Sequence, residues 1–170
     1  MPLAPKAGYS DPGFSAISGF VDNNPAFPTV EGDTSNVQDY TCGGRSYDLT
    51  DGYNHAGIDY YIWPFAWELM DSDSVEIVAA AAGTIIGKDE PVGNFDRNCD
   101  WDNIQGSGWN AVYIEHVDGS VAWYGHMKTG SLTTKTVGQA VAQGEKLGTV
   151  GSSGFSSGPH LHFELYSDMN

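Results

Sequence analysis

The chain has 170 residues, 40% of them hydrophobic, which suits a single domain with a substantial core. Its 22 acidic and seven basic residues give a net charge of −15, whereas a protein that binds nucleic-acid phosphates needs the opposite sign. No run of about 18 apolar residues occurs. We therefore expect no nucleic-acid partner and no membrane-spanning helix, and we expect a monomer. We interpret the acidity as an aid to solubility, with electrostatic steering of a cationic substrate as the alternative.

Residues 1–50 are rich in Gly, Pro, Asp, Asn and Ser and show no periodicity, which predicts an irregular N-terminal leader packed on a domain over residues 51–170. Within that domain, runs rich in β-branched and aromatic residues predict strands. They are Ile58–Trp63, Val75–Ala79, Gly83–Lys88, Trp109–Val117, Val121–His126, Gly148–Gly151 and His160–Tyr166. The helical signal is weak and limited to one short turn within Phe65–Asp71. Asp118-Gly119 lies between two strand-like runs and predicts a hairpin. The sequence thus predicts an all-β, mostly antiparallel fold with little helix.

One connection, Asp89–Gly108, is too long for an ordinary turn, which favours a functional loop. It contains Cys99, and the other cysteine is Cys42 in the leader. Their spacing matches no Cys-x-x-Cys metal or redox motif. We favour a Cys42–Cys99 disulfide over two free thiols, because both lie in loop-like sequence, and such a bond would imply export from the cytoplasm.

The segment His160-Leu161-His162 is the strongest chemical signal. Residues two apart on a strand point to the same face, so these imidazoles can share one metal. They can also divide the work, with one binding a metal and the other moving a proton.

A second pair, His55 and Asp59, lies four residues apart, which also places both side chains on one side of a strand. Together with one histidine of the His-x-His they supply two nitrogens and a carboxylate. That donor set is typical of a catalytic zinc, which has three protein ligands and an open position.

The sequence predicts different roles for the two remaining histidines, His126 and His116. His126 ends a predicted strand, and if that strand neighbours the His-x-His strand, this imidazole can act with the spare one in proton transfer and charge stabilisation. His116 has no partner in the sequence, so we expect a structural role near the hairpin. A serine nucleophile is disfavoured, because none of the serines before His160 lies in a Gly-x-Ser-x-Gly elbow.

In combination and in order, these motifs resemble the lysostaphin-type zinc metallopeptidases, a group of peptidoglycan endopeptidases that includes the staphylolysin and β-lytic enzymes. The resemblance covers about residues 55–166. The matching segments are His55-Ala56-Gly57-Ile58-Asp59, Ala81–Ile85, Tyr124-Gly125-His126, Val137–Gly148, Gly151-Ser152-Ser153-Gly154 and Gly158–Glu164.

By position, the resemblance implies that His55, Asp59 and His162 bind one Zn²⁺ and that His126 and His160 are the catalytic pair. It implies a β-sandwich or open-barrel fold with a long substrate groove. The implied reaction is hydrolysis of peptide bonds in peptidoglycan cross-links by a secreted, extracellular or periplasmic enzyme, with Gly-rich proteins as further substrates. The resemblance does not assign the general base to either catalytic histidine.

Two other functions compete with this one. A non-catalytic module of the same fold would dock on peptidoglycan or activate an amidase, although such modules lack some of the five residues present here. A lipoyl- or biotinyl-carrier domain is disfavoured, because no lysine lies in a Met-Lys-Met-like turn. Relatives also continue a little past the His-x-His strand, which leaves open whether sequence after Asn170 is missing.

Overall fold

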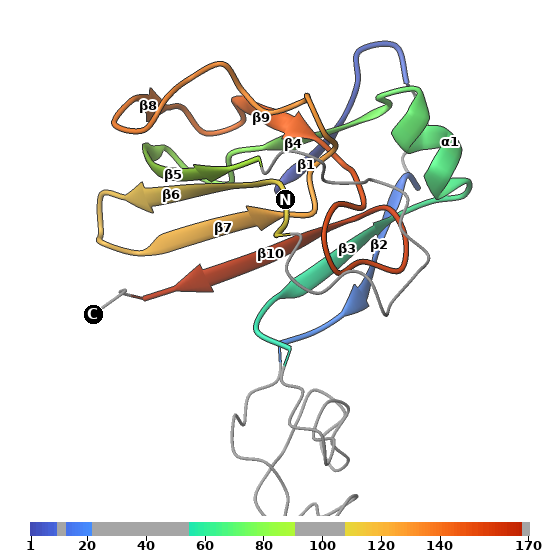
Figure 1. The fold of residues 1–170 in the computed structure, drawn as a ribbon, viewed down its shortest axis with the longest axis horizontal. Coiled ribbons are helices and arrows are strands. Elements are labelled where there is room, and N and C mark those ends of the chain that lie inside the picture. Colours follow the sequence, from blue (N-terminus) through green and yellow to red (C-terminus); the bar gives the residue numbers. More distant parts are fainter. Residues whose placement is uncertain (10–12, 22–54, 91–107, 168–170) are drawn as a thin grey trace, which may run out of the picture.

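The computed structural model describes residues 1–9, 13–21, 55–90 and 108–167, which form two antiparallel sheets and one short helix (Figure 1). The smaller sheet has three strands in the order β1-β4-β9, and the larger has seven in the order β2-β3-β10-β7-β6-β5-β8. The strands are β1 (Leu3–Pro5), β2 (Ser15–Gly19), β3 (Ile58–Ile62), β4 (Val75–Val78), β5 (Gly83–Asp89), β6 (Ala111–His116), β7 (Val121–Gly125), β8 (Ala140–Val141), β9 (Lys146–Thr149) and β10 (His160–Tyr166). The helix α1 (Ala66–Asp71) follows β3. The predicted all-β class is confirmed.

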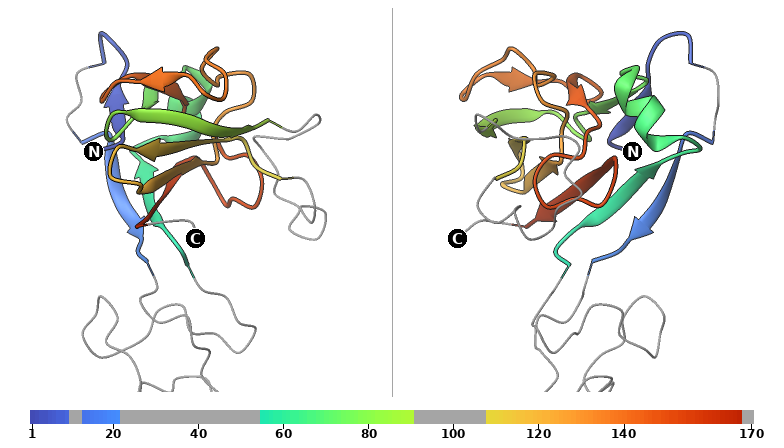
Figure 2. Two further views of the ribbon diagram at one scale, coloured as in Figure 1. Left: turned by 90° about the vertical axis from the view of Figure 1, so that its left-hand side faces the viewer. Right: turned by 45° about the vertical axis from the view of Figure 1, so that its right-hand side comes forward.

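The hydrophobic core lies between the two sheets, since one cluster of buried side chains joins strands of both (Figures 1 and 2). The smaller sheet contributes Leu3, Val75, Ile77 and Leu147, and the larger contributes Ile85, Val112, Ile114, Ala122, Tyr124 and Leu161. Alternate residues of β10 point the other way. His160, His162 and Glu164 therefore lie on the face of the larger sheet that is turned away from this core.

Most of the predicted strands, the hairpin and the short helix are present at or near the predicted residues. The hairpin between β6 and β7 turns at Asp118-Gly119, where Gly119 has φ +84° and the His116 amide donates to the Ser120 carbonyl. The short helix is present as α1. The strand expected from Gly148 begins two residues earlier, as β9. The two-residue strand β8 was not predicted, because two residues carry no detectable period.

The leader differs from the irregular chain that its composition predicts over residues 1–50. Two of its segments are strands: β1 pairs with β4, and β2 pairs with β3 at the edge of the larger sheet. Leu3 and Phe14 are buried in the core, which anchors both segments. Strands of three and five residues that contain Pro, Ser and Gly give too weak an alternation to be recognised, so pairing with neighbours decides their conformation.

Several sequence predictions lie outside the described residues. They include the Cys42–Cys99 disulfide, the boundary near residue 50 and most of the Asp89–Gly108 loop. No helix in the described part of the chain is long and apolar enough to cross a membrane.

Candidate active site

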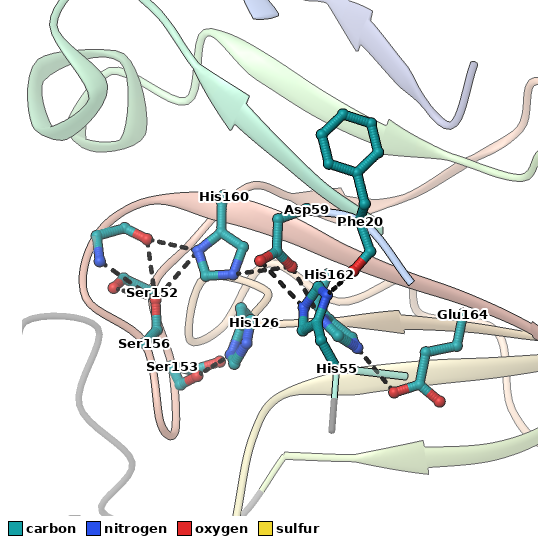
Figure 3. A network of polar contacts seen from close by, with 11 residues as sticks. Phe20, His55, Asp59, His126, Ser152, Ser153, Ser156, His160, His162 and Glu164 are labelled. Carbon is teal, nitrogen blue, oxygen red and sulfur yellow. Dashed lines mark hydrogen bonds and ion pairs between the residues drawn. The ribbon is translucent and has the colours of Figure 1, made fainter. Parts of the chain in front are cut away.

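The register of the larger sheet brings four of the five predicted site residues together. β10 lies between β3 and β7, and His162 is paired with Asp59 on one side and with Gly125 on the other. His126 directly follows Gly125, and His160 precedes His162 on the same face of β10. His55 reaches the same place from the segment before β3, so all five side chains meet (Figure 3).

His55, Asp59 and His162 form what we call the ligand cluster. Asp59 Oδ1 lies 2.8 Å from His162 Nδ1, and Asp59 Oδ2 lies 3.1 Å from His55 Nε2. The nearest potential ligand atoms of all three residues lie within 4.8 Å of one another. Ligands about 2.0–2.1 Å from a tetrahedral zinc are about 3.3 Å apart. The two imidazole nitrogens and the carboxylate therefore fit a zinc ion with little rearrangement.

The cluster holds its histidines in a strongly acidic environment. Burial disfavours the charged form of His162, but hydrogen bonds with Asp59 and Glu164 outweigh it and raise the pKa to about 9. His55 is affected in the same way: burial is outweighed by Asp59 and by the Phe20 carbonyl, 2.7 Å from Nδ1, and its pKa rises. Burial opposes ionisation of Asp59, yet the bonds with His162 and His55 lower its pKa. The ligand cluster therefore stabilises positive charge, either as protons on its histidines or as a bound divalent cation.

His126 and His160, which we call the imidazole pair, lie beside the ligand cluster with ring centroids 4.5 Å apart. Each is fixed by a backbone carbonyl: His126 Nδ1 lies 2.7 Å from Ser153 O, and His160 Nδ1 lies 2.7 Å from Gly158 O. A carbonyl can only accept, so Nδ1 carries the hydrogen in each ring and Nε2 keeps a lone pair. His160 Nε2 lies 3.5 Å from Asp59 Oδ1.

Burial governs the charge of this pair. It lowers the pKa of His126 to about 3, with the neighbouring His160 adding to the effect, and it also lowers the pKa of His160. Both imidazoles are therefore neutral at neutral pH. Two neutral bases next to a cation-binding cluster can accept a proton at Nε2 and, once protonated, donate it again.

The position of His126 depends on the end of β7. His126 has φ +58°, a left-handed conformation that is costly for a residue with a side chain. A buried asparagine, Asn110, fixes the turn: its side-chain amide donates to Met127 O, and its backbone amide donates to the Ser153 hydroxyl. Ser153 in turn accepts from His126. This network compensates for the strain and sets the direction of the ring.

Open space surrounds the two groups of histidines. A cavity of about 280 Å³ is lined by both groups and by Trp109, whose ring lies 5.1 Å from that of His126. A second cavity of about 540 Å³ lies next to it, with Asp59, Ser157 and His160 lining both. It extends over Tyr61 and the start of α1. A substrate at the histidines therefore has room to continue along the sheet.

The structure brings all five predicted residues into one site, and it leaves His116 outside, where Nδ1 lies 2.9 Å from Ala82 O near the hairpin. A further residue at the site, Glu164, was not predicted from the sequence; its Oε1 lies 2.7 Å from His162 Nε2. The signal was available, since Glu164 continues the two-residue period of His160 and His162. The roles of Asn110 and Ser153 were not predicted either, because their contacts depend on tertiary packing that no local pattern reveals.

A family model and several known proteins match this chain. The family model described as Peptidase family M23 matches residues 54–170. The chain is 46% identical over 56 residues to the cell division protein DipM of Caulobacter vibrioides, covering 33% of this chain and 9% of that protein. It is 40% identical over 56 residues to the peptidoglycan DD-endopeptidase ShyC of Vibrio cholerae, covering 33% of this chain and 12% of that protein. The match thus spans only about a tenth of each of these relatives.

A solved structure supports the fold. A mutant catalytic domain of the prophage-encoded M23 protein EnpA from Enterococcus faecalis has a TM-score of 0.51 and 22% identity, covering 92% of this chain and 82% of that one. At that identity the similarity establishes the fold alone. The family model, however, spans the whole site from the segment before β3 to β10. The chain belongs to Peptidase family M23, a family of metal-dependent peptidases.

Proposed function

We propose that this chain is a zinc metalloendopeptidase that hydrolyses peptide bonds in the cross-links of bacterial peptidoglycan. The observation that carries the proposal is the adjacency of a three-donor ligand cluster and two neutral imidazoles in one cavity, in a chain of a peptidase family. The name of the relative ShyC supports the substrate class. Because peptidoglycan lies outside the cytoplasmic membrane, we also propose that the protein acts as a secreted or periplasmic enzyme.

His55 Nε2, Asp59 and His162 Nδ1 would hold the zinc ion. When bound there, zinc polarises a carbonyl and makes a water nucleophilic near neutral pH. The imidazole pair handles the protons. One ring accepts the proton of the attacking water at Nε2 and then gives it to the leaving amine nitrogen, so that this ring ends neutral as it began. The other ring, with a proton taken up from solvent at Nε2, donates a hydrogen bond to the developing oxyanion. Hydrogen bonds to Ser153 O and Gly158 O keep both Nε2 atoms directed away from the backbone, toward the cavity.

The alternative is a non-catalytic module of the same fold that binds peptidoglycan. A binding surface has no need for two neutral imidazoles, one of them buried and in a strained backbone conformation, beside a ligand cluster. The cost of that arrangement favours catalysis.

Purified protein incubated with isolated peptidoglycans of different cross-link chemistry tests the proposal, with the released fragments identified by mass spectrometry. We expect new amino and carboxyl termini at one type of cross-link, loss of activity with a chelator and recovery with Zn²⁺. A Gly-rich protein such as elastin tests the wider substrate range. His162→Ala and Glu115→Ala, the latter at an exposed side chain of β6, are the matched inactive and active controls. Stoichiometric binding to peptidoglycan without any cleavage in the presence of Zn²⁺ would support the binding module instead.

A further inference from the structure

Glu164 is a buried carboxylate that contacts the ligand cluster without belonging to it. It lies on β10, on the same face as His160 and His162, and only 6% of it is exposed. Oε1 lies 2.7 Å from His162 Nε2 (Figure 3). The Tyr166 hydroxyl donates to Oε2. Four successive same-face residues of one strand, His160 to Tyr166, are thus joined to the site.

Burial of this carboxylate is expensive. Transfer of an ionised carboxylate from water costs several kcal/mol unless its oxygens are hydrogen-bonded and paired. Among the ion pairs formed by the described residues, Glu164 has His162 as its partner and no lysine or arginine. Both of its oxygens are used, one by an imidazole of the ligand cluster and one by a hydroxyl. His162 is therefore the group that balances the charge of this carboxylate.

This contact determines how His162 presents its two nitrogens. A carboxylate accepts hydrogen bonds, so Nε2 carries a hydrogen directed at Glu164. The opposite nitrogen, Nδ1, is left to face Asp59 and His55. A ring rotated by half a turn about its Cβ–Cγ bond would lose both arrangements.

The ring is also confined sterically. A Cβ atom added to Gly57 would lie 2.6 Å from His162 Nε2 and 2.7 Å from the Phe163 carbonyl, so the ring passes close over a backbone that has no side chain. The Trp109 ring lies on another side, with centroids 5.5 Å apart. Packing restricts the plane of the imidazole, and Glu164 selects which nitrogen points at the site.

We propose that Glu164 is a positioning residue for His162: it fixes the ring rotation and the tautomer in which Nδ1 faces a divalent cation, and Tyr166 holds Glu164 in place. The inference rests on the proposed function, because it assumes that the ligand cluster binds zinc. Outer-shell carboxylates of this kind make the histidine a better ligand, and their loss typically weakens metal binding about 10–100-fold.

The test measures zinc affinity directly, by competition between the metal-free protein and a chromophoric chelator. We expect Glu164→Ala to bind Zn²⁺ about 10–100-fold more weakly than the unsubstituted protein. Glu164→Gln should recover most of this loss, because its amide oxygen still accepts from Nε2–H. Tyr166→Phe should produce a smaller loss, and Glu115→Ala should produce none. Thermal unfolding of each metal-free variant shows whether the folded state has changed.

The conservative variant separates positioning from other roles. A zinc affinity of Glu164→Ala equal to that of Glu115→Ala would overturn the inference, and so would a Glu164→Gln variant as weak as Glu164→Ala, because attraction by charge would then explain the effect. If Glu164→Ala does not fold, Glu164→Gln and Tyr166→Phe decide the question by the same affinities. An unsubstituted protein that binds no zinc would refute the proposed function and this inference together, whereas normal zinc-dependent hydrolysis with unchanged affinities would refute only the inference.

Discussion

The two groups of histidines in the site are built from the same residue type but behave as opposites. In the ligand cluster, His55 and His162 contact carboxylates, and their pKa values are raised. In the imidazole pair, His126 and His160 contact backbone carbonyls, and burial lowers their pKa values although those hydrogen bonds, and Asp59 at 3.5 Å from His160 Nε2, act in the opposite direction. The ring centroids of His126 and His162 are only 5.8 Å apart. Burial lowers the pKa of all four rings, so the difference is that the carboxylates around His55 and His162 outweigh burial, whereas the partners of His126 and His160 do not.

This contrast suggests how one strand serves two purposes. His160 and His162 are two residues apart on β10, yet Asp59 and Glu164 bracket His162, whereas His160 is bonded to Gly158 O in its own loop. A carboxylate-bound ring is suited to attracting a cation, and a carbonyl-bound ring keeps a neutral nitrogen for proton transfer. The partners around each histidine thus support the division of roles that we propose.

The strongest test of the division compares His162→Ala with His160→Ala for zinc binding. Removal of His162 takes away one of three donors, so we expect zinc affinity to fall by more than the roughly 100-fold upper range for outer-shell partners. Removal of His160 should leave zinc affinity nearly unchanged. Equilibrium dialysis with metal analysis measures both. Equal zinc loss in the two variants would mean that the two histidines share one role.

Turnover provides the converse comparison. With zinc bound, His126→Ala and His160→Ala should each lower kcat by about 10²–10⁴-fold, the usual contribution of a general acid or base. Zinc content should remain stoichiometric in both. Steady-state kinetics on a soluble cross-link peptide, with metal analysis of the same samples, checks this. Either variant keeping most of the original kcat would remove that histidine from the proposed mechanism.

The sequence predicted most of this site because the essential spacings are local. A period of two along β10 places His160 and His162 on one face, and the four-residue spacing of His55 and Asp59 does the same near β3. The resemblance to a known family then assigned residues that spacing alone left ambiguous. The same period extends to Glu164 and Tyr166, so these contacts were within reach of the sequence.

Other parts of the structure depend on long-range pairing. β1 and β2 form because β4 and β3 offer partners, and Leu3 and Phe14 find the core only in the folded chain. The hydrogen bonds of Asn110 join residues far apart in the sequence. The opposite pKa shifts of the histidines likewise depend on which groups the fold brings to each ring. None of these features leaves a periodic signal in the sequence.

A glycine beside the ligand cluster and a glycine beside the imidazole pair can also be compared. A Cβ on Gly57 would meet His162 Nε2 at 2.6 Å and the Phe163 backbone at 2.7 Å, whereas a Cβ on Gly158 would meet nothing within 4 Å. We expect Gly57→Ala to displace the His162 ring and lower kcat/KM by up to about 100-fold, as misplacements of about 1 Å can do. Gly158→Ala should change it little. Equal effects of the two substitutions would show that the ring of His162 is not confined as described.

In the metal-free protein, the imidazole pair and the ligand cluster should change the free energy of unfolding with pH in opposite directions. His126 has a folded pKa of about 3, below the unfolded value of 6.5, so the unfolded state binds more protons between these values and stability is lost as pH falls below about 6.5. At pH 5 this one group costs about 2 kcal/mol relative to pH 7.5. His126→Asn, whose amide can still donate to Ser153 O, should remove that loss.

His162 acts in the opposite direction. With a folded pKa of about 9, it contributes stability that is fully present below pH 6.5 and is lost as pH rises toward 9. Denaturant unfolding at pH 5, 7.5 and 9 in the presence of a chelator measures both effects. His126→Asn should reduce the change in the free energy of unfolding between pH 5 and 7.5, and His162→Asn should reduce the change between pH 7.5 and 9. The reverse pattern would contradict the charge states inferred for His126 and His162.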